Sequence, residues 1–257
     1  MPLIWAVRFH IRQVPAMINS NGRVASMTHD ELETHVFSTY ITLRYGMAVL
    51  AFAFPIILYF VGRIHNIPLQ DSMSAYYHAL PPNGIPFIDL FAPRSFFVGL
   101  LFAIGAFLYL YKGFSSLENM LLNVAGVCAW GVALYPIPWA CDPTCPKITP
   151  HYIFAVVLFV CIGAVSIYCT RQTLHLLKDE RTRRQYVRLY NTLGAAMLAS
   201  PVAAIVVSFA LGEFKKHIFF IEAAGVWAFA AYWWVKSREL AITEAEKLAL
   251  SRRGLET

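Results

Sequence analysis

Four residues have side chains of the types that zinc binds in catalytic sites: His78, Asp89, His151 and His217. Nitrogen and oxygen ligands from three of them would leave one position for a water molecule, which the metal would activate for hydrolysis. Ser74 and Glu222 are the candidates for accompanying catalytic or orienting groups. If the fold brings this set together, it predicts a metal-assisted hydrolase.

The segment from Ser74 to His78 is predicted to form a short helix between two apolar segments. Asp71 or Ser72 is the expected N-cap, and a Pro-Pro-Asn-Gly sequence follows as a stop signal. Ser74 and His78 are four residues apart, so a helix would place them on one face. The aromatic ring and hydroxyl of Tyr77 suit the headgroup zone of a bilayer. We therefore expect this helix on the outer surface, or dipping over the bundle as a cover.

Glu222 is five residues beyond His217, roughly 7.5 Å along a helix, and thus below the level of the preceding loop. A carboxylate at that depth needs a partner, which Arg94 or a histidine would supply. An ion pair that joins two spans accounts for Glu222 as economically as a ligand site does. The candidates for binding a ligand on this face are Tyr77, His78, Arg94 and Glu222.

Two of the five cysteines, Cys141 and Cys145, lie in a loop assigned to the outer side. In that potentially oxidising compartment they are predicted to form a short-loop disulfide. A metal site would need more ligands than this pair provides. The other cysteines lie inside apolar segments, where a thiol acts as a small apolar side chain.

The elements that position these residues follow from composition. Of 257 residues, 58% are apolar and only 14% are charged, and the mean hydropathy is +0.54. A soluble domain carries about 25% charged residues, so these values exclude the soluble and disordered classes. About 20 apolar helical residues cross a bilayer. Six segments qualify, at about Tyr45–Val61, Ser95–Tyr111, Leu117–Pro136, Tyr152–Thr170, Asn191–Leu211 and Ile218–Val235.

The basic residues predict the orientation of these spans. With both termini on one side, that side receives 16 of the 21 Lys and Arg residues and the other side receives 5. The positive-inside rule then makes both termini cytoplasmic. The net charge of +6 is thus explained without nucleic acid, and membrane lipids are the expected partners. We predict a cell-membrane protein with an N-terminal segment (1–40), a six-span domain (41–238) and a cytoplasmic tail (239–257).

Small side chains indicate where these spans pack. Ala125, Ala129 and Ala133 recur at four-residue spacing in the third span, and Ala195, Ala199 and Ala203 recur likewise in the fifth. Such stripes let helix backbones approach closely in lipid. Asn119 and Asn123, which share one face of the third span, are expected to hydrogen-bond to other helices. Thr28 and Glu31 form a capping box that would open the helix leading into the first span.

Several motifs carry a resemblance to known proteins. The sequences Ser74-Ala-Tyr-Tyr-His78, Arg94-Ser-Phe-Phe-Val-Gly99 and Tyr111-Lys112-Gly113 resemble a widespread group of bacterial six-span membrane proteins of unassigned activity, over roughly residues 40–240. Ser74, His78 and Asp89 are also similar in type and order to the membrane hydrolases that include alkaline ceramidases and progestin-receptor-like proteins. That resemblance implies a zinc site, but the final His-x3-His of that superfamily is missing here, and it has seven spans.

We therefore expect an all-α polytopic membrane protein that binds or senses a lipid or small ligand at a polar site on its outer face, without a cofactor. A transporter would show inverted repeats or midplane charges, which this sequence lacks. The alternative is a zinc-dependent hydrolase of a lipid amide or ester. The basic connection from Lys178 to Arg188 would lie on the cytoplasmic side, where it could contact anionic lipid.

Overall fold

The computed structural model describes residues 29–81, 92–138, 148–210 and 216–243. Every regular element in these ranges is helical, and six helical segments are long and apolar enough to cross a membrane, as predicted. The elements are α1 (His29–Ile64), the 3-10 helix η1 (Ser74–Tyr77), α2 (Pro93–Leu110), α3 (Ser116–Leu134), α4 (Pro150–Ala164), the π-helical η2 (Val165–Cys169), α5 (Arg171–Leu174), α6 (Glu180–Ala210) and α7 (Lys216–Thr243).

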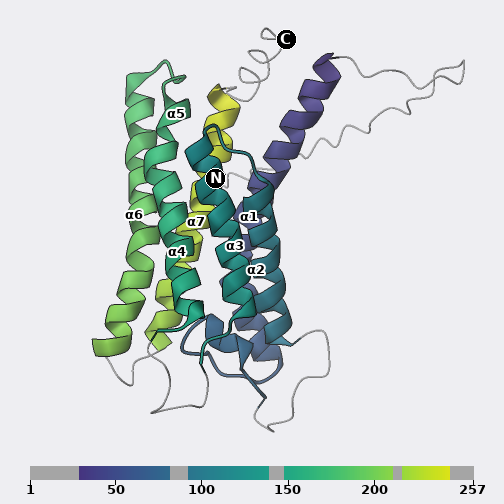
Figure 1. Cartoon of the computed structure of the whole chain (residues 1–257), viewed down its shortest axis with the longest axis vertical. Coiled ribbons are helices and arrows are strands. Elements are labelled where there is room, and N and C mark those ends of the chain that lie inside the picture. The colour runs from purple at the N-terminus through teal and green to yellow at the C-terminus, as the bar shows by residue number, and fades with distance from the viewer. Residues whose placement is uncertain (1–28, 82–91, 139–147, 211–215, 244–257) are drawn as a thin grey trace, which may run out of the picture.

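The six long helices form a closed ring, in which α1 contacts α2, α2 contacts α3, α3 contacts α4, α4 contacts α6, α6 contacts α7, and α7 returns to α1. The helices run roughly parallel to the long axis of the molecule, with η1 at one end and α5 at the other (Figure 1). We call these two ends the η1 end and the α5 end. By the predicted topology the η1 end faces outward and the α5 end faces the cytoplasm.

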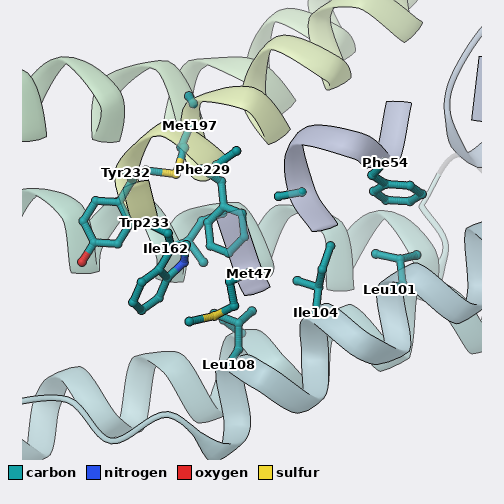
Figure 2. Close-up of a cluster of buried hydrophobic side chains, with 14 of the residues drawn as sticks. Met47, Phe54, Leu101, Ile104, Leu108, Ile162, Met197, Phe229, Tyr232 and Trp233 are labelled. Atoms are coloured by element: carbon teal, nitrogen blue, oxygen red, sulfur yellow. The ribbon is translucent and has the colours of Figure 1, made fainter. Parts of the chain in front are cut away.

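Apolar side chains fill the ring and also cover its outside. Figure 2 shows part of the interior, where Met47 from α1, Leu108 from α2 and Trp233 from α7 come together. On the outer surface Phe52 and Phe60 are each 58% exposed. A soluble bundle would present polar residues there, whereas lipid provides an apolar solvent for such side chains.

The alanine prediction holds for one span and fails for the other. Ala125 and Ala129 are fully buried, which confirms the stripe in α3 as a packing face. In α6, however, Ala195 and Ala199 are exposed, and Met197 and other side chains are buried instead. Alanine is apolar as well as small, so it is equally stable facing lipid, and a stripe of it does not by itself fix a packing face.

Glycine allows a close contact between α2 and α3. A Cβ atom on Gly105 would lie 2.9 Å from the Gly126 carbonyl oxygen, and one on Gly126 would lie 2.7 Å from the Gly105 carbonyl oxygen. Neither backbone could accommodate a side chain without moving. The pair fixes how closely α2 approaches α3.

Three helices extend well beyond their predicted spans, and one polar contact differs from its prediction. α1 begins at His29, next to the predicted capping box, whose Thr28 lies outside the described residues. α6 begins at Glu180, eleven residues before its predicted span, and α7 continues to Thr243. Asn119 accepts a hydrogen bond from the Gly113 amide at 2.7 Å, in the connection that leads into α3. Asn119 therefore stabilises the start of its own helix, whereas the sequence predicted a hydrogen bond to another span.

Candidate functional site

A cavity of about 100 Å³ lies inside the ring and reaches the η1 end. One face each of α2, α4 and α7 forms most of its wall. The lining residues on each helix recur every three or four positions, as residues on one helical face do. They are Phe97, Leu101, Ile104 and Leu108 from α2, His151, Ala155, Leu158, Phe159 and Ile162 from α4, and Glu222, Val226 and Phe229 from α7, with Phe54, Met73, Ser74 and Val132.

The cavity is long and narrow. Its lining extends along α2 from Phe97 to Leu108, eleven residues further on, which corresponds to about 16 Å at the helical rise. The same distance separates His151 from Ile162 on α4. A volume of about 100 Å³ spread over that length leaves room for a thin chain rather than for a ring system. Leu101, Ile104 and Leu108 project from α2 in Figure 2, with Phe229 of α7 in the same view.

Three polar side chains lie at one end of this apolar cavity. His151 is in the first turn of α4, Glu222 is in the second turn of α7, and Ser74 begins η1. All three belong to the η1 end, while the wall toward the α5 end is aliphatic and aromatic. Ser74 and His151 are buried, at 7% and 4% exposure. The cavity therefore has a polar end and an apolar body.

Glu222 holds η1 against α7. Its Oε2 accepts a hydrogen bond from the Met73 amide at 2.7 Å, and the Phe219 amide donates to the Asp71 carbonyl oxygen at 2.8 Å. The partner expected from the sequence was Arg94 or a histidine, and that expectation is wrong. A backbone amide of η1 satisfies the carboxylate because the α1–α2 connection folds back over the end of the ring.

η1 is shorter than the predicted helix. It is a single 3-10 turn, with Ser72 Oγ accepting from the Ala75 amide at 3.1 Å. With three residues per turn, positions four apart no longer share a face. Ser74 accordingly lines the cavity, and His78 does not. Burial raises the pKa of the phenol of Tyr76, within η1, above its ordinary value.

The structure brings His78 and His151, two of the predicted metal ligands, to one stretch of backbone, where each contacts a carbonyl oxygen. His151 Nδ1 lies 2.8 Å from the Tyr135 carbonyl oxygen, and His78 Nε2 lies 2.9 Å from the Ile137 carbonyl oxygen. Both carbonyls lie within three residues after the end of α3 at Leu134. The two histidines thus connect α4 and the η1 segment to the end of α3.

The other ligand candidates form a separate group beside the cavity. Arg94 Nε donates to the Tyr77 carbonyl oxygen at 2.9 Å, and its guanidinium lies 4.5 Å from the centre of the Tyr77 ring. The Tyr77 and His78 rings are 4.9 Å apart. Of the four predicted ligand-binding residues, only Glu222 lines the cavity.

Several predictions concern residues in other places. His217 is exposed in the first turn of α7 and does not line the cavity. Within the described residues, no three or more His, Cys, Asp or Glu side chains form a group that could hold a metal ion. Asp89, Cys141 and Cys145 lie outside the described residues. The remaining cysteines are buried with free thiols, as expected: Cys128, Cys161 and Cys169.

A second polar group lies at the α5 end, deep inside the ring. Lys236 Nζ lies 2.7 Å from Glu239 Oε2 and donates to Thr173 Oγ1 at 2.6 Å. Tyr190 donates to the same Glu239 oxygen at 3.1 Å. Lys236 and Glu239 are 1% and 0% exposed. This ion pair joins α5, α6 and α7.

Sequence reasoning missed both the cavity wall and this ion pair. The wall had a signal, since Phe97, Leu101, Ile104 and Leu108 keep one face of a helix. Lys236 and Glu239 also had the spacing of a helical pair. The predicted last span ends at Val235, so the sequence places Lys236 just beyond that span and Glu239 in the cytoplasmic tail.

The chain matches no protein-family model, no curated protein and no solved structure. The family resemblances drawn from its motifs stay predictions.

Proposed function

We propose that this multi-pass membrane protein binds a small amphipathic molecule in the cavity beneath η1. The observation that carries the proposal is one cavity with an apolar body about 16 Å long and three polar side chains, Ser74, His151 and Glu222, at a single end. An amphipathic ligand would match both parts at once. The chemistry fits a lipid-derived molecule that enters from the predicted outer leaflet.

The polar end favours a ligand that donates hydrogen bonds. Glu222 is an acceptor, and within the described part of the chain its Oε1 has no hydrogen-bond partner. A hydroxyl, amide N–H or ammonium group would supply the missing donor. A carboxylate head would place a second acidic group beside Glu222 in a poorly solvated site, where ionisation of both groups is unfavourable. We therefore assign the ligand an alcohol, amide or amine head.

The body of the cavity favours an unbranched aliphatic chain. Its walls are Leu, Ile, Val, Phe and Ala side chains, and each buried methylene contributes about 0.8 kcal/mol when it leaves water. A six-carbon chain thus contributes about 5 kcal/mol, which corresponds to binding in roughly the submillimolar range before the cost of ordering the ligand. The narrow space excludes a second chain, so the ligand has one.

The test uses three probes with the same chain: hexylamine, 1-hexanol and hexanoate. With the full chain purified in detergent, we expect hexylamine and 1-hexanol to raise the melting temperature and hexanoate to leave it unchanged. Ala155→Phe places a ring in the cavity wall and should abolish both shifts. Glu222→Gln removes the charge and should weaken hexylamine binding more than 1-hexanol binding.

Ala195→Phe is the matched control, because Ala195 is an exposed alanine on α6 away from the cavity. It should bind like the unmodified protein, so that any partitioning of the probes into detergent cancels. Equal shifts in Ala155→Phe and Ala195→Phe would disprove the proposal, and so would tighter binding of hexanoate than of hexylamine.

The zinc-dependent hydrolase has no comparable observation in its favour. The Nδ1 of His151 and the Nε2 of His78 each contact a backbone carbonyl oxygen, and His217 is outside the cavity. Asp89 lies outside the described residues. One zinc per chain in the purified protein, lost in His151→Ala, would favour the hydrolase over the simple binding protein.

A further inference from the structure

A basic groove lies between α5 and the first turns of α6, at the opposite end of the molecule from the cavity. Its volume is about 430 Å³. Leu174 from α5 and Val187 from α6 are its aliphatic residues, and Leu174 is 2% exposed. The charged side chains along it are those of Arg171, Glu180, Arg183, Arg184 and Arg188.

The positively charged side chains of the groove outnumber its negatively charged ones. Glu180 is its one carboxylate, and Glu180 Oε2 contacts Arg183 at 2.5 Å while Oε1 contacts Arg184 at 3.2 Å. Among the described residues, no acidic side chain forms an ion pair with Arg171 or Arg188. Two guanidinium groups, one from each helix, thus line a common space in which the single carboxylate, Glu180, pairs with other arginines.

Guanidinium groups are suited to one class of ligand in particular. Each presents a planar set of N–H donors that matches two oxygens of a phosphate, and it stays protonated at all physiological pH values. Arg183 and Arg184 keep donors beyond their contacts with Glu180. His175 also lines the groove and adds a further donor on the α5 side. The groove thus combines arginines from two helices around one space.

The groove lies where a bilayer has its headgroups. The fourth candidate span ends at Leu174 and the fifth begins at Glu180, so the groove is at the junction of two spans. Tyr168, one turn before α5, is 66% exposed, and exposed tyrosines are typical of the membrane interface. Basic pockets between spans are where anionic headgroups bind.

We infer that the groove between α5 and α6 binds a phosphate group, carried by a lipid headgroup or free in solution, through Arg171 and Arg188. This inference does not depend on ligand binding in the cavity beneath η1. The two aliphatic residues would contact the first carbons attached to the phosphate, which gives a phosphate ester an advantage over an inorganic ion.

The test compares the unmodified full chain with the double variant Arg171→Gln/Arg188→Gln. Both arginines are exposed, so their replacement leaves the packed interior unchanged. The matched control is Lys178→Gln/Arg181→Gln, which removes the same charge from exposed residues of the same connection that do not line the groove. The probes are inorganic pyrophosphate, and phosphatidic acid against phosphatidylcholine with identical acyl chains.

Bound lipid is counted by native mass spectrometry, and pyrophosphate binding is followed by the melting temperature. We expect phosphatidic acid to bind the unmodified protein and the control variant at least tenfold more tightly than the groove variant, with phosphatidylcholine unaffected. The same pattern with pyrophosphate alone would identify a soluble phosphate as the source. Equal losses in both double variants would mean diffuse charge attraction and overturn the site, as would an undiminished affinity of the groove variant for both probes.

Discussion

Glu222 has two tasks at the η1 end. One carboxylate oxygen accepts from the Met73 amide and so anchors η1, and the side chain also lines the cavity. A ligand that engages Glu222 would therefore act on the residue that holds the cover in place. The sequence identified Glu222 as a buried acid in need of a partner, but a backbone amide has no signature in residue types, so its actual partner was beyond prediction.

Replacing Glu222 should loosen η1. Glu222→Ala leaves the Met73 amide without its acceptor, at a cost of about 1.5–3 kcal/mol for a charge-assisted hydrogen bond. The Met73 amide should then exchange with solvent deuterium roughly ten- to a hundredfold faster. Glu222→Gln retains an acceptor oxygen and should exchange at an intermediate rate. Unchanged exchange at Met73 in Glu222→Ala would refute the anchoring role.

At the α5 end, the buried pair of Lys236 and Glu239 should behave as a unit. Removing one partner, as in Lys236→Met, leaves a buried charge uncompensated and should lower the free energy of unfolding by about 3–5 kcal/mol. The double variant Lys236→Met/Glu239→Leu removes both charges and should recover most of that loss. The measurement is a double-mutant cycle by denaturation in mixed micelles. Additive losses would show that the two side chains are not coupled.

Among the elements, α2 contains two glycines in opposite environments. Gly105 contacts α3 closely, whereas a Cβ on Gly99 would meet nothing within 4 Å. Helix propensity alone favours alanine at both positions by about 1 kcal/mol. At Gly105 the tertiary contact outweighs that preference, and at Gly99 it does not.

These two substitutions should therefore have opposite signs. Gly105→Ala places a Cβ 2.6 Å from Trp130 Nε1 and 2.9 Å from the Gly126 carbonyl oxygen, and should destabilise the protein by about 1–3 kcal/mol. Gly99→Ala, on the same helix, should leave stability unchanged or raise it by up to about 1 kcal/mol. Thermal unfolding of the two variants side by side makes the comparison. A stabilising Gly105→Ala would contradict the close contact of α2 and α3.

The sequence predicts the spans but not the faces on which they pack. All six spans were predicted because a run of apolar residues is sufficient to identify a lipid-crossing helix. Which face of each helix packs inward is a different question in a membrane, where the outward face is apolar as well. For this reason the stripe at Ala195 indicates the wrong face of α6, and the sequence does not distinguish the cavity face of α4 from its lipid-facing side.

At the scale of the whole molecule, the 16-to-5 distribution of basic residues predicts which end faces the cytoplasm. Single cysteines placed at exposed Asp71, near η1, and exposed Asp179, near α5, test this in a background without native cysteines. In intact cells a membrane-impermeant thiol reagent should label the Asp71→Cys variant directly and the Asp179→Cys variant only after permeabilisation. The reverse pattern would invert the molecule, placing the basic groove outside and the cavity entrance inside.

The central claim is that the cavity beneath η1 receives an amphipathic ligand, and photolabelling tests it most directly. A hexylamine with a diazirine at its far carbon would be bound to the full chain, irradiated, and its attachment sites mapped by peptide mass spectrometry. We predict labels on the cavity faces of α2, α4 and α7, around Leu101, Leu158 and Val226, that 1-hexanol suppresses and Ala155→Phe removes. Labels confined to lipid-facing residues such as Phe52 and Val202, insensitive to both, would contradict it.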